Sequence, residues 1–221
     1  MQPRLDRGLG LDSVAAALFD LDGTLVDSES VHRAAWQSFF ASRGWEISDE
    51  TYAAHIVGRR GADAFRSLDG PWRDEDPETL MDEVLTHQAS VAAEPGRIPG
   101  AAELVRAVHR AGTPIAVVTS ALRSWVDEAL DFVGVADLVS VVVSGEDVSA
   151  GKPDPEGYLA ACDRLGVDPA HVAAFEDSVS GVTAASAAGI ARVFGVLTTS
   201  QADALRAAGA HHIIDDLLDL T

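Results

Sequence analysis

The stretch A-A-A-L-F-D-L-D-G-T-L-V-D-S at residues 15–28 organises the interpretation of the whole chain. An apolar run ends at Asp20, one leucine separates Asp20 from Asp22, and Gly23 follows. The apolar run predicts a buried strand, and the glycine predicts a tight turn. Residues two apart in an extended strand point to the same side, so the two carboxylates are expected to project together. Like charges this close are unfavourable without a counter-charge, which predicts a divalent cation beside them.

The acidic pair has two other interpretations. Asp and Gly are ordinary turn residues, so the pair by itself is compatible with a turn that has no function. A calcium-binding loop requires Gly at its sixth position and Glu at its twelfth. Counted from Asp20, those positions hold Leu25 and Val31, which excludes that loop.

The composition is that of a globular protein. The chain has 221 residues, of which 47% are hydrophobic, enough for one large domain or a domain with an insert. No apolar run approaches the roughly 20 residues that span a bilayer, and residues 1–13 lack the apolar centre of a signal peptide. The single cysteine, Cys162, allows no intramolecular disulfide. We therefore expect a cytoplasmic protein.

The formal net charge of −19 limits the classes of partner. It argues against binding to nucleic acid or to an anionic membrane, because both carry the same sign of charge. We expect a small-molecule ligand and a monomer, with a dimer as the alternative. If the ligand is anionic, a local positive cluster or a metal ion has to overcome the field of the protein.

Residues 29–94 have apolar side chains at helical spacing and predict four helices. These run from residue 29 to Gly44 and over 49–57, 61–68 and 77–93, with no strand among them. From residue 95 the pattern alternates. Helices are predicted over 100–111, 122–132, 155–165, 179–188 and 201–208, and strands over 114–119, 138–144, 171–176, 191–196 and 211–214.

Repeated strand–helix units predict an α/β fold with a Rossmann-like parallel sheet covered on both faces. The first strand, residues 14–19, belongs to this sheet but is separated from the rest by the helical unit. The predicted organisation is therefore a catalytic core of residues 1–28 and 95–221, interrupted by a four-helix insert of residues 29–94.

Polar side chains follow several predicted strands at the edge where ligands bind in open parallel sheets. Asp20 and Asp22 follow the first strand, Thr119 and Ser120 another, and Glu176 and Asp177 a third, with Lys152 in G-K-P-D-P before a helix. Taken singly, Thr119-Ser120 and Asp177-Ser178 are also typical of helix caps, and a lone lysine is usually solvated. Their joint placement favours a functional site.

Physical chemistry suggests a role for each side chain. Asp20 and Asp177, assisted by Glu176, are the carboxylates expected to hold Mg²⁺. Thr119 or Ser120 is expected to donate a hydroxyl hydrogen bond to a phosphoryl oxygen, and Lys152 to add positive charge. Asp20 is a candidate nucleophile that forms an aspartyl-phosphate. Asp22 is then the general acid for the leaving oxygen and the base for the incoming water.

These motifs resemble the haloacid dehalogenase superfamily. Four stretches are similar to its four motifs, in the same order: D-L-D-G-T-L-V-D-S at 20–28, V-V-T-S at 117–120, G-K-P-D-P at 151–155 and F-E-D-S-V-S-G at 175–181. The resemblance implies Asp20 as nucleophile, Asp22 as acid/base, and Mg²⁺ held by Asp20, the Asp22 backbone carbonyl and Asp177. The dehalogenase branch lacks an aspartate like Asp22, so phosphoryl transfer is favoured.

The helical insert resembles the α-helical cap of the subgroup with β-phosphoglucomutase, phosphoglycolate phosphatase and the sugar- and polyol-phosphate phosphatases. Caps of this kind close over the site and supply specificity. His32, Arg59 and Arg60 are the candidate substrate residues; packing of His32 on Trp36 and a solvated arginine turn remain the alternatives. Val57 stands where the mutase has lysine, which favours a phosphatase of small phosphorylated metabolites over a mutase.

A phosphorylated signalling receiver is the alternative from another class. Receivers also gather acidic residues, Mg²⁺, Thr or Ser and Lys around a phosphorylated aspartate. They have about half this length and no helical insert, and they have no use for a residue such as Asp22. A nucleotide-binding loop is not predicted, because Pro153 stands where that loop needs Ser or Thr.

Overall fold

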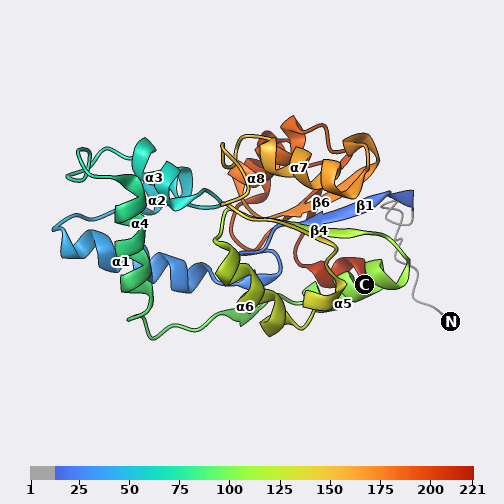
Figure 1. Ribbon diagram of the computed structural model, residues 1–221, viewed down its shortest axis with the longest axis horizontal. Helices are drawn as coiled ribbons and strands as arrows, with labels where there is room; N and C mark the ends of the chain where they lie inside the picture. The colour runs from blue at the N-terminus through green and yellow to red at the C-terminus, as the bar shows by residue number, and fades with distance from the viewer. Residues whose placement is uncertain (1–12) are drawn as a thin grey trace.

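The computed structural model describes residues 13–221 and contains a parallel sheet of six strands (Figure 1). Across the sheet the strands are β5 (Val141–Val143), β4 (Ile115–Val118), β1 (Ala16–Phe19), β6 (Val172–Glu176), β7 (Arg192–Val196) and β8 (His212–Ile214). Strand β1 lies in the middle, paired in parallel with β4 on one side and β6 on the other. The predicted α/β fold with a parallel sheet is confirmed.

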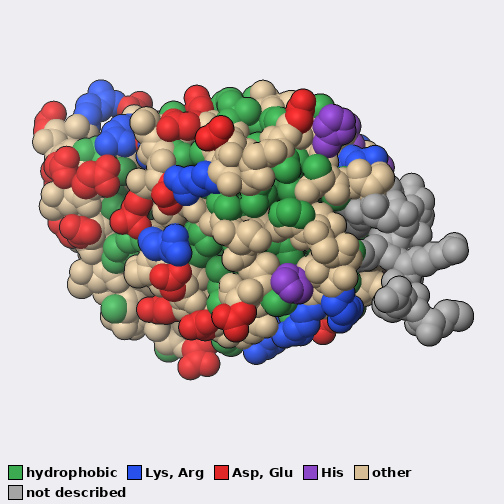
Figure 2. Space-filling model, turned by 45° about the vertical axis from the view of Figure 1, so that its right-hand side comes forward, with side chains coloured by type: hydrophobic (Ala, Val, Ile, Leu, Met, Phe, Trp, Pro, Cys, Tyr) green, Lys and Arg blue, Asp and Glu red, His purple; other side chains and the backbone are tan. Residues whose placement is uncertain are grey.

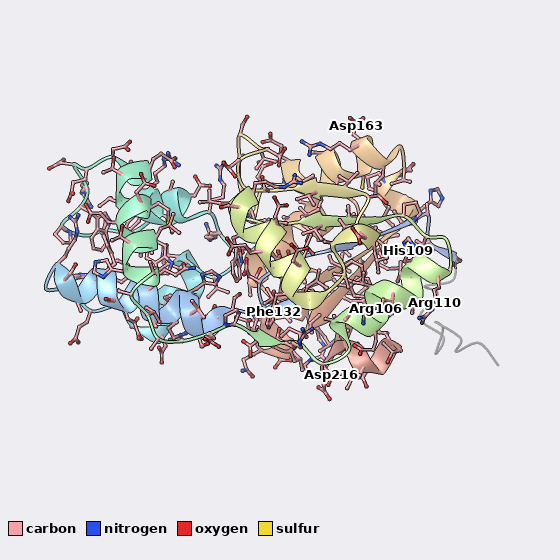
Figure 3. The ribbon with its side chains drawn as sticks, turned by 60° about the horizontal axis from the view of Figure 1, so that its bottom comes forward. Arg106, His109, Arg110, Phe132, Asp163 and Asp216 are labelled. Carbon is pink, nitrogen blue, oxygen red and sulfur yellow. The ribbon has the colours of Figure 1, made fainter. Side chains whose placement is uncertain are left out.

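Helices cover both faces of the sheet, as the alternating sequence pattern predicts. They are α5 (Ala101–Arg110), α6 (Arg123–Val133), α7 (Glu156–Leu165), α8 (Val179–Ala187) and α9 (Ala202–Ala208), with short 3₁₀ turns at Ala136–Leu138, Pro169–His171 and Leu217–Leu220. Helices α5 and α6 lie below the sheet in Figure 1, and α7 and α8 lie above it. The side chains of Arg106, His109 and Arg110 on α5 lie far from the helices of residues 29–88 (Figure 3).

Strand β1 contributes alternate side chains to two hydrophobic cores, because its residues face opposite sides of the sheet in turn. Phe19 stacks on Phe175, with ring centroids 4.6 Å apart, and Phe175 stacks on Phe194 at 4.9 Å. Leu18 belongs to the core on the opposite face, which α7 and α8 cover. Because the strand is buried on both faces, its sequence is a continuous apolar run.

Residues 29–88 hold four helices, α1 (Glu29–Ser42), α2 (Asp49–His55), α3 (Gly61–Ser67) and α4 (Pro77–Gln88). They lie at one end of the sheet (Figure 1) and form a hydrophobic core of their own. Aromatic side chains dominate that core, including Trp36, Phe39 and Phe40 of α1, and Trp72 is 1% exposed. A separate core indicates that this unit is stabilised mainly by its own packing.

A two-stranded antiparallel sheet joins the entry and the exit of the helical unit. Strand β2 (Val26–Asp27) pairs with β3 (Gly96–Arg97), so that Val26 faces Arg97. Neither strand is predicted from the sequence, since two-residue strands are too short to show any periodicity. The pairing holds the two connecting segments side by side.

Most predicted elements agree with the structure to within one or two residues. Two do not. The helix predicted over 77–93 ends at Gln88, because the backbone N–H and the hydroxyl of Ser90 both donate to the His87 carbonyl at 3.0 and 2.7 Å and close the last turn. The strand predicted over 138–144 covers only Val141–Val143, since residues 136–138 form a 3₁₀ turn.

No helix within residues 13–221 is long and apolar enough to cross a membrane. The expectation that the first 13 residues are not a signal peptide lies, apart from Ser13, outside the described residues. Acidic side chains outnumber basic ones on the face shown in Figure 2, consistent with the net charge of −19.

Candidate active site

The carboxyl ends of β4, β1 and β6 bring the predicted polar residues together. In the parallel register, Phe19 lies beside Val117 on one side and beside Phe175 on the other. Asp20 and Thr119 follow the last residues of β1 and β4, and Glu176 is the last residue of β6, so the three meet at one edge of the sheet, and all three are buried.

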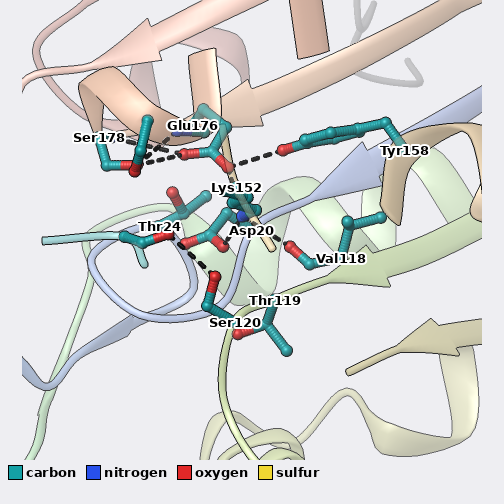
Figure 4. A network of polar contacts seen from close by, with 12 residues as sticks. Asp20, Thr24, Val118, Thr119, Ser120, Lys152, Tyr158, Glu176 and Ser178 are labelled. Carbon is teal, nitrogen blue, oxygen red and sulfur yellow. Dashed lines mark hydrogen bonds and ion pairs between the residues drawn. The ribbon is translucent and has the colours of Figure 1, made fainter. Parts of the chain in front are cut away.

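Lys152 is the only lysine of the chain, and it lies at the centre of this edge. Its ammonium donates to Asp20 Oδ1 and to Glu176 Oε1, both at 2.5 Å, and to the Val118 carbonyl at 3.0 Å (Figure 4). Burial opposes the charge on Lys152, but Asp20 and Glu176 outweigh it and raise the lysine pKa. Lys152 is therefore a permanent cation with all three N–H groups used.

Glu176 acts mainly as the partner of Lys152. It is fully buried and also accepts a hydrogen bond from the Tyr158 hydroxyl at 2.7 Å and from Ser178 Oγ at 3.2 Å (Figure 4). Sequence analysis missed Tyr158. Its position three residues into α7 gives no signal in the sequence, because only the packing of α7 on the sheet turns the hydroxyl toward Glu176.

Asp20, Glu176 and Asp177 form a group of carboxylates that could hold a metal ion. One oxygen from each lies within 4.8 Å of the others. Burial raises the pKa of Asp177 to about 7, with the charge of Glu176 adding to the effect, and burial likewise raises the pKa of Asp20. Three buried carboxylates face a single ammonium, so a hard divalent cation fits both the charge and the oxygen donors.

Gly23 leaves room for Asp177 in this group. Its φ of +84° lies in the left-handed region, and a Cβ at this position would come within 2.0 Å of Asp177 Oδ2. Only glycine satisfies both conditions. Thr24 Oγ1 donates to Asp177 Oδ1 at 3.2 Å and fixes the other oxygen.

The side chain of Asp22 lies outside this carboxylate group, which corrects the expectation that one cation lies between the carboxylates of Asp20 and Asp22. Asp22 Oδ1 accepts hydrogen bonds from Ser28 Oγ at 2.6 Å and from Trp125 Nε1 at 2.8 Å, and lies 3.1 Å from His32 Nε2. The residues after Asp20 form a tight turn rather than a strand, so the alternation of side chains stops there.

Hydrogen bonds control the charge of Asp22. Burial alone raises the pKa of its carboxyl, but the charge of His32 and the donors around Oδ1 lower it overall. Burial opposes protonation of His32, yet the Asp22 charge raises the imidazole pKa. Sequence analysis missed Ser28 and Trp125 as partners of Asp22. Ser28 lies only six residues away, whereas Trp125 comes from α6 and gives no sequence signal.

Thr119 and Ser120 have different surroundings. Thr119 is buried, and its Oγ1 accepts the Ala121 N–H at 3.1 Å, which leaves its hydroxyl hydrogen available. Ser120 Oγ donates instead to the Gly58 carbonyl at 2.9 Å. The Ser120 hydroxyl therefore joins the helical unit to the sheet, which differs from the phosphate-binding role expected for it.

The two arginines of the turn before α3 also differ. Arg60 Nη1 donates to the Val148 carbonyl and Nη2 to the Ser149 carbonyl, both at 2.9 Å, while Nε donates to Asp63 at 2.7 Å. Arg60 thus holds the helical unit against the sheet unit, and its donors are occupied. Arg59 lines the cavity between the two units and, among the described residues, makes no ion pair or side-chain hydrogen bond.

That cavity has a volume of about 590 Å³ and connects the catalytic edge with the helical unit. Its lining includes Asp22, His32, Arg59 and Trp36. His32 approaches Trp125 edge-on, with ring centroids 6.2 Å apart. A volume of this size holds a small organic molecule.

Comparison with known proteins agrees with this geometry. A family model described as haloacid dehalogenase-like hydrolase matches residues 14–189. The chain belongs to the haloacid dehalogenase-like hydrolases. It is 37% identical to a validoxylamine A 7'-phosphate phosphatase of Streptomyces hygroscopicus subsp. limoneus, over 92% of this chain and 94% of that one.

Other relatives in this family are similar over almost the full length. A β-phosphoglucomutase of Mycobacterium bovis is 31% identical over 97% of this chain and 94% of its own. The crystal structure of CbbY from Rhodobacter sphaeroides with phosphate superposes with a TM-score of 0.77 at 28% identity, covering 94% of this chain and 96% of that one. The expected family and the expected class, a phosphoric monoester hydrolase, are confirmed.

Proposed function

We propose that this chain is a Mg²⁺-dependent phosphatase that hydrolyses a phosphorylated sugar or polyol through an aspartyl-phosphate. The observation that carries the proposal is the position of Asp20, buried at the edge of the sheet and held by Lys152 at 2.5 Å. A buried carboxylate oriented by a fixed ammonium is suited to attack phosphorus. Relatives named as phosphatases of phosphorylated carbohydrates support the substrate class.

In the proposed reaction, the Asp20 carboxylate attacks phosphorus while the bond from phosphorus to the leaving oxygen breaks. Asp22 gives its proton to that oxygen, and the neutral alcohol leaves. Asp22 then takes a proton from water, which attacks the phosphorus of the aspartyl-phosphate and releases phosphate and Asp20. Thr119 is proposed to donate its free hydroxyl hydrogen to a phosphoryl oxygen.

The remaining residues are proposed to prepare the site for this chemistry. Asp20, Asp177 and the Asp22 carbonyl would hold Mg²⁺, with Glu176 near them, and the ion would supply positive charge to the phosphoryl oxygens. Lys152 fixes the orientation of Asp20, and His32 fixes that of Asp22. Arg59 is proposed to attract the phosphorylated ligand into the cavity.

Residues 29–94 are proposed to act as a cap domain over a core of residues 1–28 and 95–221. The bonds from Arg60 to the Val148 and Ser149 carbonyls, and from Ser120 to the Gly58 carbonyl, support a closed arrangement. The β2–β3 pair lies at the only two crossings of the chain between these proposed domains.

The test is phosphate release from a panel of sugar, polyol and two-carbon acid phosphates with Mg²⁺. We expect release from the sugar or polyol esters, and none from Asp20→Asn, which keeps the fold. Asp22→Ala is expected to lower turnover by roughly 10²–10⁴. A wild-type protein that releases no phosphate from any of these esters would refute the proposal.

A phosphomutase is the second candidate, since the relatives include β-phosphoglucomutases. It predicts isomerised sugar phosphate without net phosphate release, which the same assay detects. A phosphoglycolate phosphatase is a third candidate within the same reaction class, and the two-carbon ester in the panel tests it.

A further inference from the structure

The cavity above Asp22 has an acidic residue in the wall formed by α1. Glu29 is the first residue of α1 and lines the cavity together with His32 and Tyr52. Residues three apart on a helix lie on the same face, so Glu29 is a neighbour of His32, which contacts Asp22. Glu29 and Asp22 therefore line the same cavity, on either side of His32.

The carboxylate of Glu29 is not fully satisfied by the protein. Its Oε1 is buried and has no hydrogen-bond partner within residues 13–221. The nearby cation is Arg33, whose Nε lies 3.6 Å away, beyond hydrogen-bond length. Arg33 is also bound through Nη1 to Asp49 at 2.6 Å. A buried oxygen without a donor is costly, and a donor on a bound ligand relieves that cost.

Burial raises the pKa of Glu29, while the charges of His32 and Arg33 and a hydrogen bond with the Tyr52 hydroxyl oppose that effect. Those two charges are already shared with Asp22 and Asp49. This wall of the cavity is thus poor in free positive charge and offers an acceptor. Arg59 belongs to a different wall, the turn that precedes α3.

We propose that Glu29 determines specificity by accepting a hydrogen bond from a hydroxyl of the leaving group. The site then selects phosphate esters of neutral polyols and sugars. It rejects esters whose leaving group carries a carboxylate or a second phosphate at that position, because that group and the Glu29 carboxylate carry like charges. This inference rests on the proposed phosphatase function.

The experiment uses pairs of esters that differ only in –CH₂OH against –COO⁻ at the far end. Glycerol 3-phosphate is compared with 3-phosphoglycerate, and sorbitol 6-phosphate with 6-phosphogluconate. A hydrogen bond to a charged group changes binding by about 10- to 100-fold, so wild-type kcat/KM favours the alcohol of at least one pair by about that factor.

Glu29→Gln keeps the volume of the side chain and removes its charge. We expect this variant to reduce the preference for the alcohol ester about tenfold, chiefly through a lower KM for the acid ester. Asp49→Asn is the matched control, since it removes the other carboxylate bound to Arg33 but lies outside the cavity. It is expected to keep the wild-type preference.

The outcomes separate the two proposals. A wild-type enzyme inactive on all four esters and on the wider panel overturns the proposed function. An active enzyme with equal kcat/KM within both pairs overturns only the role of Glu29, as does an unchanged preference in Glu29→Gln. If Glu29→Gln does not fold, Glu29→Asp, which keeps the charge, must retain the preference for the alcohol.

Discussion

Lys152 is expected to stabilise the buried carboxylates at the edge of the sheet. The perturbation is Lys152→Met, which keeps the length of the side chain and removes its charge. Lys152 is 6% exposed and is the counter-charge shared by Asp20 and Glu176. Removing one partner of a buried ion pair costs about 3–5 kcal/mol, because the remaining charge stays buried without compensation. We expect a loss of that size in the free energy of unfolding.

The same reasoning predicts strong coupling with Glu176. Once the ammonium is gone, Glu176 only repels Asp20, so Glu176→Gln in the Lys152→Met background removes a repulsion instead of an attraction. The double variant is expected to be more stable than the sum of the single effects, by about 1–3 kcal/mol. The amide that Glu176→Gln introduces is still able to accept the hydrogen bond of Tyr158.

The assay is urea denaturation of the four proteins of this cycle, followed by circular dichroism. EDTA is present throughout, so that a bound metal ion does not neutralise the carboxylates. Lys152→Arg, which keeps the charge, serves as a geometric control and is expected to be destabilised as well, because a planar guanidinium does not fit three acceptors arranged around one nitrogen. Additive effects within about 0.5 kcal/mol would refute the coupling.

Three further predictions concern the neighbouring groups. Trp125→Phe removes a donor from Asp22, so the Asp22 pKa should rise. The alkaline limb of the kcat/KM profile should then move to higher pH, because the carboxyl that protonates the leaving oxygen keeps its proton to higher pH; an unchanged profile contradicts this. Gly23→Ala should destabilise the fold by at least about 1 kcal/mol and weaken Mg²⁺ binding by calorimetry, since the new Cβ collides with Asp177; wild-type affinity contradicts this. Hydrogen bonds from Ser144 lower the pKa of Asp147 to about 2, so the ionised carboxylate stabilises the fold above its ordinary pKa near 4 and loses that effect as pH falls toward 2. Asp147→Asn should therefore lower the free energy of unfolding by about 1 kcal/mol at pH 6 and by roughly half as much at pH 3. An equal loss at both pH values contradicts this.

The sequence predicted the sheet well because local patterns carry that information. Continuous apolar runs specify strands buried on both faces, and the runs of β1, β4 and β6 end in polar residues that need partners when they are buried. The ends of parallel strands meet at one edge, so Asp20, Thr119 and Glu176 could be grouped from the order of the chain alone. The four helices followed from their spacing, although the end of α4 depended on a local hydrogen bond of Ser90 that spacing does not reveal.

Within the site, the sequence identified residue types better than their partners. Arg60 and Ser120 have the chemistry of phosphate ligands, yet both donate to backbone carbonyls across the two units. Nothing local specifies those carbonyls, since they lie 88 and 62 residues away along the chain. Trp125 and Tyr158 were missed for the same reason.

The acidic pair Asp20 and Asp22 shows most clearly which features the sequence determined and which the tertiary structure decided. The sequence by itself determined that two carboxylates follow a buried strand, and that the chain contains one lysine to balance them. Only the tertiary structure decided that the turn at Gly23 separates the two side chains, so that Lys152 holds Asp20 while His32, Ser28 and Trp125 hold Asp22. The physical reason is that the sequence pattern of a strand predicts the direction of its side chains only while the backbone stays extended. The partners of a buried charge come from distant segments that packing brings together.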